Sequence, residues 1–428
     1  MLTALILTFV LCLLAGMPIA FCIGLSSLTG IIVAGDIPLI LLPQKMFTGV
    51  DFYALVAIPF FILAGELMNA GKITATIINF TQLLVGRLSG GLAHVNILAS
   101  MFFAGITGAA VADTSAMGSI MIPAMEKEGY DKPFAAAVTA ASSVMGPIIP
   151  PSIIMVIYAM VEGSVSIGAL FLAGIIPGIL IGLSQMFISW FIAVKRGYPK
   201  SDEPFSFLEL LKASKKAVLP LLTPIIIMGG ILGGIFTPTE AAAVAVFYAF
   251  IIGHFVFKTL PLKAIPPLLF KTCLTTGMVF LIFCTGKVLV VLLTISDVPQ
   301  LLTDIILSIT NNPLYFLLLV NIMLLIVGCF MEVGVAIIIL VPVLAPVAAA
   351  MGIESLHFAI IVVVNLCIGL ITPPLGVVLF VVCGVGNVTM ESISKAILPY
   401  LITMIMILLV ITFYPAITLL IPKYFGYL

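Results

Sequence analysis

The chain has 428 residues, of which 63% are hydrophobic and only 8% charged, and its formal net charge is zero. Soluble domains carry roughly 25% charged residues, so this composition excludes a soluble globular protein and indicates an all-α polytopic membrane protein. The neutral balance gives no reason to expect a nucleic-acid partner, and the expected surroundings are the lipid bilayer. The seven cysteines fall in apolar segments without metal-ligand spacing, so we expect small core residues rather than disulfides.

Most apolar segments are long enough to cross the bilayer, which takes about 20 residues in a helix. In chain order, the predicted full spans are about 2–34, 52–70, 132–162, 166–195, 217–236, 239–258, 272–293, 356–384 and 396–421. Two further apolar stretches, about 91–127 and 313–350, are interrupted near their middles, and we predict that they form re-entrant hairpins. Shorter amphipathic pieces near 72–87, 207–216, 261–271 and 296–310 are expected to lie at the membrane interface.

The first predicted hairpin is interrupted by glycines and small polar residues in the stretch GITGAAVADTSAMGSIMIP, at 105–123. Asp113, Thr114 and Ser115 are residue types that favour the N-cap of a helix, so they predict that the second limb starts there. The limbs on either side are short for a full span, which favours a helix that enters the membrane, turns and leaves by the same side. Non-helical backbone at membrane depth is tolerated only inside protein or beside a water-filled cavity, so the turn indicates a site.

The second predicted hairpin repeats this pattern in VGCFMEVGVAIIILVP, at 327–342. Glu332 takes the place of Asp113, and Gly334 takes the place of Ser115. Two interrupted segments of the same design are harder to explain as ordinary kinked spans than one would be. The match therefore favours a functional interpretation of both tips.

Each hairpin is followed by a second break that ends in two prolines, at 142–151 in the first half and at 365–374 in the second. Interrupted apolar segments at matching places in two halves are typical of transporters with inverted repeats. We therefore predict inverted repeats at 1–197 and 239–428, separated by a cytoplasmic linker and one extra span at 198–238. A chain of this design is expected to bind its substrate at the hairpin tips.

The distribution of Lys and Arg favours a topology with the N-terminus inside. In that topology, most of the 17 basic residues fall on cytoplasmic segments, as the positive-inside rule requires. The exceptions are Lys45 and Lys423, which fall outside, and Lys287, which lies within a span. The first hairpin is then expected to open to the cytoplasm and the second to the periplasm.

The hairpin tips and the proline breaks are rich in oxygen atoms, which hard cations such as Na⁺ prefer as ligands. Each proline removes a backbone donor and frees a carbonyl in the preceding turn. We predict one Na⁺ between each tip and its neighbouring break, and hence two or more Na⁺ sites. The alternative is an ordinary proline kink at each break, with Asp113 acting only as a helix cap. The candidate ligands are Gly108, Asp113, Ser142, Ser143 and Gly146 in the first half, and Glu332, Asn365, Gly369 and Thr372 in the second.

Other charged residues in apolar segments are costly and are functional candidates by default. Glu240 is expected to cap the start of a span, whereas Glu66 and Lys287 lie near span ends and are expected to snorkel or to pair. The only arginines, Arg87 and Arg196, lie at the predicted cytoplasmic border, so a carboxylate inside the membrane would depend on helix N-termini, hydroxyls and bound Na⁺. No nucleotide-binding loop or zinc-protease motif is present, and we do not expect an enzyme.

Four motifs, in this order, resemble one known family. They are GAAVADTSAMGSIMIPAM at 108–125, GPIIPPS at 146–152, GGIFTPTEAAAVAV at 233–246 and GLITPPLGVVLFV at 369–381. Through them the chain resembles, over essentially its whole length, the large membrane subunit of tripartite ATP-independent periplasmic (TRAP) transporters.

The resemblance implies Na⁺-coupled uptake of an organic acid across the bacterial inner membrane. It implies an elevator mechanism, in which a domain that carries the hairpins slides against a scaffold. The acid would be delivered by a periplasmic binding protein. A small four-helix membrane subunit is expected as a separate polypeptide, because this sequence holds no additional four spans.

Sialic acid and C4-dicarboxylates are among the family's substrates, so the resemblance implies that a carboxylate binds at the tips. The residues predicted to bind it are Thr114, Ser115, Gly334, Pro150 and Pro373. Two other classes stay open. One is a self-sufficient, ion-coupled anion permease of similar fold. The other is a membrane scaffold without a transport role, against which the matched breaks argue.

Overall fold

The computed structural model describes residues 1–71, 73–200, 207–310 and 312–427, and every regular element in them is helical. The elements are α1 (Leu2–Leu14), α2 (Ile19–Ala34), α3 (Leu41–Val50), η1 (Tyr53–Val56), α4 (Ala57–Ala70), α5 (Ile73–Val85), α6 (Gly91–Thr107), α7 (Ala110–Lys127), α8 (Lys132–Ser143), α9 (Ile153–Glu162), α10 (Ile167–Arg196), α11 (Phe207–Leu232), α12 (Pro238–Ile251), η2 (Ile252–Val256), η3 (Leu262–Ala264), α13 (Ile265–Ile295), α14 (Val298–Ile309), α15 (Pro313–Phe330), α16 (Val333–Ala350), α17 (Ser355–Gly369), α18 (Val377–Gly386), α19 (Met390–Phe413) and α20 (Ala416–Tyr424). Within the described part of the chain, eight helices are long and apolar enough to cross a membrane. The predicted all-α polytopic fold is confirmed.

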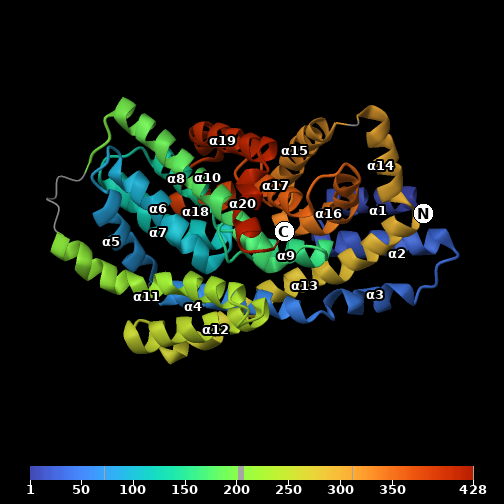
Figure 1. The fold of residues 1–428 in the computed structure, drawn as a ribbon, viewed down its shortest axis with the longest axis horizontal. Helices are drawn as coiled ribbons and strands as arrows, with labels where there is room; N and C mark the ends of the chain where they lie inside the picture. The colour runs from blue at the N-terminus through green and yellow to red at the C-terminus, as the bar shows by residue number, and fades with distance from the viewer. Residues whose placement is uncertain (72, 201–206, 311, 428) are drawn as a thin grey trace.

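The helices form two layers (Figure 1). Helices α3, α4, α11, α12 and α13 run along the lower side of the view, and we call them the scaffold layer. Within it, α4 packs against both α12 and α13, and α3 packs along α13. Above it lie α6–α10 and α15–α20, which we call the hairpin layer. The two layers meet where α4 and α13 contact α6, α9 and α16.

The hairpin layer contains both predicted hairpins, α6–α7 and α15–α16. The outgoing limb of each one packs against a helix from the other half of the chain: α7 against α18, and α16 against α9. The long helices α10 and α19 also pack together. This exchanged packing agrees with two related halves, and the boundaries at 1–197, 198–238 and 239–428 stay a prediction.

The predicted spans 132–162 and 356–384 are each two helices rather than one. The first is divided into α8 and α9, and the second into α17 and α18. The breaks contain the cis bonds Pro150–Pro151 and Pro373–Pro374, at matching places in the two halves. The proline pairs therefore interrupt the helices completely instead of only bending them.

The prediction of a single span at 2–34 is wrong, because α1 and α2 form an antiparallel helical hairpin. The Thr29 hydroxyl donates a hydrogen bond to the Thr8 hydroxyl, with 3.0 Å between the two oxygens. The reversal falls at Gly16, which has a φ of +73°, and Pro18, which precedes α2. A hairpin returns the chain to its starting side, so the first 34 residues do not make the crossing assigned to them. The basic residues still divide into the same two groups, since the first lysine is Lys45. With no crossing before Lys45, the positive-inside rule places the N-terminus outside, on the side of Lys45, instead of inside.

Two predicted interfacial pieces are instead the beginnings of long helices. The piece at 207–216 is continuous with α11, and most of 261–271 belongs to α13. Helix α13 starts at Ile265 with prolines in its first turn, where a missing N–H costs nothing. Lys271 therefore lies on a long scaffold helix. Lys72, one of the basic residues that the predicted topology places on the cytoplasmic side, lies outside the described residues.

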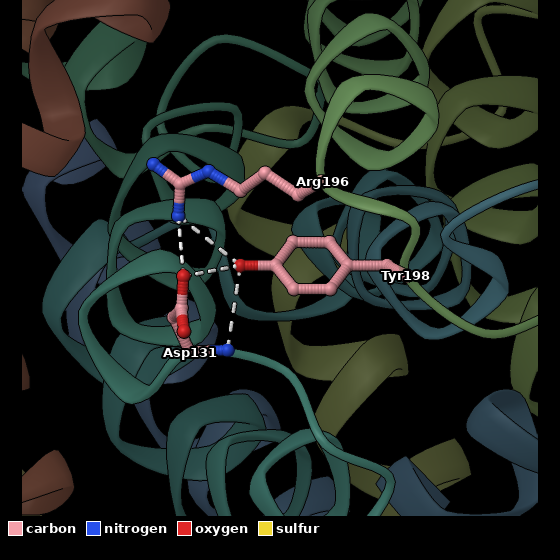
Figure 2. A network of polar contacts seen from close by, with 3 residues as sticks. All are labelled: Asp131, Arg196 and Tyr198. Atoms are coloured by element: carbon pink, nitrogen blue, oxygen red, sulfur yellow. Dashed lines mark hydrogen bonds and ion pairs between the residues drawn. The ribbon is translucent and has the colours of Figure 1, made fainter.

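A polar cluster ties the turn between α7 and α8 to the end of α10 (Figure 2). Arg196 Nη1 lies 2.6 Å from Asp131 Oδ2, and the Tyr198 hydroxyl donates to the same oxygen at 2.7 Å. Tyr130 donates to the Pro199 carbonyl at 3.1 Å. Burial raises the pKa of Tyr130 to about 12 and raises that of Tyr198, so both hydroxyls stay protonated and can donate. The cluster gives Arg196 a structural role.

Candidate functional site

A cavity of about 370 Å³ lies between the scaffold layer and the hairpin layer. Its volume is within the range of roughly 300–1,000 Å³ that is common for small-molecule sites. Both hairpin tips reach it, from α6–α7 and from α15–α16, and α4 and α13 form the opposite wall. Its polar lining residues are Glu66, Asn69, Thr107, Ser115, Lys271, Thr275 and Glu332. The cavity therefore combines parts of the chain that are far apart in sequence.

The tip of the first hairpin turns at Gly108 and Ala109. Gly108 has a φ of +61°, and a Cβ there would lie 2.8 Å from the Pro151 carbonyl oxygen, so only glycine fits without strain. Ala109 is the N-cap of α7 and offers no side-chain cap. The predicted helix start at 113–115 is therefore wrong, since α7 begins at Ala110.

The early start of α7 directs its first turn toward the cavity. Asp113 is the first residue whose N–H reaches back to the Ala109 carbonyl. The N–H groups of Ala110, Val111 and Ala112 precede that bond, and all three residues line the cavity. An uncapped helix N-terminus carries unpaired donors and the positive end of the helix dipole. This arrangement can bind an anion.

The tip of the second hairpin is capped, unlike the first. Glu332 is the N-cap of α16, and its carboxylate accepts a hydrogen bond from the Val335 N–H at 3.1 Å. Glu332 and Gly334 both line the cavity. A Cβ on Gly334 would lie 3.0 Å from Glu332 Oε2, so a larger residue would crowd the carboxylate. Glu332 therefore does not have the setting of Asp113, with which the sequence aligned it.

Asp113 is fully buried beneath the first tip, beside the hydroxyls of Ser100 and Ser143. Neither of its carboxylate oxygens has a hydrogen-bond partner. The two hydroxyls donate elsewhere: Ser143 to the Thr139 carbonyl at 2.8 Å, and Ser100 to Ser142 Oγ at 3.1 Å. Both hydroxyls also face the Asp113 carboxylate and can rotate to donate to it. A buried carboxylate beside two hydroxyls is a cluster of oxygens that fits a hard cation such as Na⁺.

Two polar residues of this group were missed by sequence reasoning, Ser100 and Asn96. Asn96 donates to Thr139 Oγ1 at 2.7 Å, and its own Oδ1 has no partner although it is buried. Both residues lie on α6, within an apolar stretch. The sequence could have indicated them, because Asn96 and Ser100 are one helical turn apart in an otherwise apolar limb.

The candidate ligands of the second half do not gather in the same way. Asn365 on α17 faces Asn321 on α15, and it donates to the backbone oxygen of Asn321 at 3.0 Å and to Asn321 Oδ1 at 2.7 Å. Its own Oδ1 is buried without a partner. The Thr372 hydroxyl, in the break that follows α17, donates to the Ile368 carbonyl near the end of that helix. Glu332 faces the cavity instead. Asn321, which the sequence reasoning missed, completes this pair of amides.

The remaining predicted residues divide between the cavity and the core. Ser115 is exposed, and both Ser115 and Gly108 line the cavity. Thr114 is buried, and its hydroxyl donates to the Ala110 carbonyl at 2.8 Å. Gly146 and Gly369 provide close backbone contacts, and Pro150 and Pro373 lie in the breaks. Their assignment to substrate or ion stays a prediction.

The scaffold wall carries an ion pair that sequence reasoning did not find. Lys271 Nζ on α13 lies 2.7 Å from Glu66 Oε1 on α4. Glu66 was expected to snorkel or to pair, and pairing is confirmed. Lys287 lines a smaller cavity of about 160 Å³, and Ile338 borders both cavities. Glu240 accepts from the Thr237 N–H at 2.7 Å in a capping box, which confirms its structural role.

Comparisons with known proteins agree with the family resemblance. Residues 6–417 match the family model described as "Tripartite ATP-independent periplasmic transporter, DctM component". The chain is 43% identical over 419 residues to the "Sialic acid TRAP transporter large permease protein SiaM" of Vibrio cholerae, with 97% of each chain covered. It is 36% identical over 427 residues to the "C4-dicarboxylate TRAP transporter large permease protein DctM" of Rhodobacter capsulatus, again with 97% of each covered. The solved YdaH transporter of Alcanivorax borkumensis has a similar fold, with a TM-score of 0.63, 14% identity and 86% of each chain covered.

Proposed function

Because this chain belongs to the DctM component family of tripartite ATP-independent periplasmic transporters and is a multi-pass protein of the bacterial inner membrane, we propose that it imports an organic acid as the large membrane subunit of such a transporter. The observation that carries the proposal is the cavity between the two layers, which both hairpin tips reach. Sialic acid and C4-dicarboxylates, named for its relatives, are the substrate classes to test first.

The acid group of the substrate binds at the first hairpin tip. There the N–H groups of Ala110–Ala112 open into the cavity, and the Ser115 hydroxyl lies one turn further along the same helix. A helix N-terminus is worth up to about 2 kcal/mol to an anion in a partly buried site. The second tip is less suitable, because the Glu332 carboxylate already occupies the N-terminus of α16.

Na⁺ drives the uptake. Asp113, Ser100 and Ser143 would hold one ion directly behind the tip that binds the acid. The Na⁺ would supply positive charge next to the binding site, and the carboxylate of Asp113 would be neutralised by it rather than repel the substrate. Ion and substrate binding are coupled by this proximity. A second ion is assigned to the other half, where the buried Oδ1 of Asn365 has no partner.

The transport step is a movement of the hairpin layer against the scaffold layer. The cavity lies between the two layers, with the tips on one and with α4 and α13 on the other. Substrate bound to the tips would therefore travel with the hairpin layer. This elevator motion would expose the bound substrate to one side of the membrane and then to the other, while both hairpin tips keep their structure.

Two partners complete the proposal: a periplasmic binding protein that delivers the acid and a separate small membrane subunit. Both are expected for a member of this family. The second candidate is a self-sufficient anion permease, which would use the same cavity without a binding protein or a small subunit.

Reconstitution tests the proposal directly. Proteoliposomes should hold the chain with the small membrane subunit, and the binding protein should be added outside with labelled N-acetylneuraminate or succinate. We expect uptake of one acid under an inward Na⁺ gradient, and little uptake when any of the three proteins is omitted. Full uptake by the chain alone would instead favour the permease. No uptake of any organic acid by the complete system would contradict the proposal.

A further inference from the structure

We propose that Lys271 on the scaffold layer binds the acid group of the substrate in the conformation of this structure, by exchanging Glu66 for the substrate as its ion partner. The inference rests on the proposed function, because it assigns a second contact for the same anion. Together with the first tip, it places one positive group on each layer. The substrate class it implies is an acid with at least one group that stays anionic at neutral pH.

The geometry of the pair suits an exchange. The Lys271 side chain is 62% exposed, whereas the Glu66 side chain is only 15% exposed. An ammonium group has three N–H donors, and the contact of 2.7 Å with Glu66 Oε1 accounts for one of them. Both residues line the cavity. Before substrate arrives, Glu66 therefore holds the ammonium in place from the side of the protein. The other two donors are open to the cavity, where an incoming acid can begin the exchange.

The charges of the cavity lining explain why an anion would pair with Lys271. Among the described lining residues, Glu66 and Glu332 are negative and Lys271 is positive. With Lys271 paired to Glu66, the negative charge of Glu332 is left unbalanced among the described lining side chains. An anion that approaches Lys271 meets the one ammonium in this described lining, and a pair in a largely apolar cavity is stronger than the same pair in water. Glu66 lowers this attraction without abolishing it, so a bound acid can still be released.

The two partners therefore have opposite expected effects, which a purely structural ion pair would not show. Glu66→Gln frees the ammonium and should tighten binding of the acid. Lys271→Gln removes the ammonium and should weaken binding about tenfold or more. Lys271→Arg keeps the charge and should retain binding. Lys263→Gln is the matched control, because Lys263 is exposed in η3, just before α13, and is not part of the cavity lining.

The experiment measures half-maximal concentrations for uptake of N-acetylneuraminate and succinate by the complete reconstituted system, together with the Na⁺ requirement and the heat stability of each purified variant. The methyl ester of N-acetylneuraminate serves as a competitor without the acid group. We expect Lys271→Gln to raise the half-maximal acid concentration and Glu66→Gln to lower it. Neither variant should change the Na⁺ requirement, and competition by the ester should be the same in both.

A double variant separates binding from folding. Glu66→Lys combined with Lys271→Glu restores an ion pair, so it should recover heat stability but not acid binding. Recovery of both, or equal losses in the two single variants, would show that the pair is only structural and would overturn the inference. If Lys271→Gln takes up acid at the wild-type rate and with an unchanged half-maximal concentration, this inference is overturned while the proposed function stands. A wild type that takes up no acid would overturn the proposed function as well.

Discussion

Gly328 and Gly369 bring two helices into direct backbone contact behind the second hairpin tip. A Cβ built on Gly369 would lie 2.5 Å from the carbonyl carbon of Gly328 and 2.6 Å from its Cα. Backbone atoms cannot give way as a flexible side chain can. In the first half, a Cβ on Gly146 would lie 3.1 Å from the carbonyl carbon of Ala109, which is a looser contact.

We expect Gly369→Ala to disrupt the second hairpin. Overpacking of a tight contact costs about 1–3 kcal/mol, and here backbone would have to move. The measurements are the heat stability of the purified chain and uptake by the complete system. Gly384→Ala on α18 is the control, since a Cβ there meets nothing within 4 Å. Equal stability of the two variants would contradict the assigned packing.

Asp113 and Ser143 are expected to set the Na⁺ requirement. Ser143→Ala removes one oxygen beside the buried carboxylate, and Asp113→Asn removes the charge, so both should raise the Na⁺ concentration for half-maximal uptake. Asn365→Ala should do so as well if a second ion binds there, and wild-type uptake should then depend sigmoidally on Na⁺. The measurement is initial uptake at varied Na⁺ with choline as replacement. Uptake that follows a proton gradient and ignores Na⁺ would refute the ion assignment.

Ser115 and Thr114 are neighbours with different expected roles. Ser115→Ala should weaken uptake about tenfold, because a hydrogen bond to a charged group is worth about 1.5–3 kcal/mol. Thr114→Val should have a smaller effect, since the Thr114 hydroxyl bonds to its own helix and does not line the cavity. The half-maximal substrate concentrations of the two variants are to be compared at saturating Na⁺. A larger effect at Thr114 would place the acid group elsewhere.

Residues on the two sides of α11 should label from opposite sides of the membrane. Lys200 precedes α11, and Ile235, with 70% of its surface exposed, lies in the turn before α12. Single cysteines at these positions, in a cysteine-free background, are to be treated with a membrane-impermeant maleimide in oriented vesicles. The basic-residue bias predicts that Lys200→Cys is cytoplasmic and Ile235→Cys periplasmic. Labelling of both from the same side would contradict the predicted topology.

The sequence by itself determined the membrane class, the two hairpins and the two proline breaks. These features depend on local sequence. The apolar composition decides that the chain lies in the membrane rather than in water, and glycine and proline decide where a helix cannot continue. Gly108 is one of the glycines that interrupt the first hairpin stretch, and the chain turns there because its φ is +61°. The start of α7 was misjudged, because good N-cap residue types at 113–115 were outweighed by the turn that Gly108 and Ala109 form against the Pro151 carbonyl.

Only the tertiary structure decided which side chains meet. Glu66 and Lys271 pair because α4 and α13 pack together, although about two hundred positions separate them in the chain. The same holds for Asn321 with Asn365 and for Ser100 beside Asp113. Spacing within one helix predicts a shared face, but contacts between helices depend on how their apolar surfaces fit. The composition of the cavity, and with it the charge that a substrate meets there, follows from that fit.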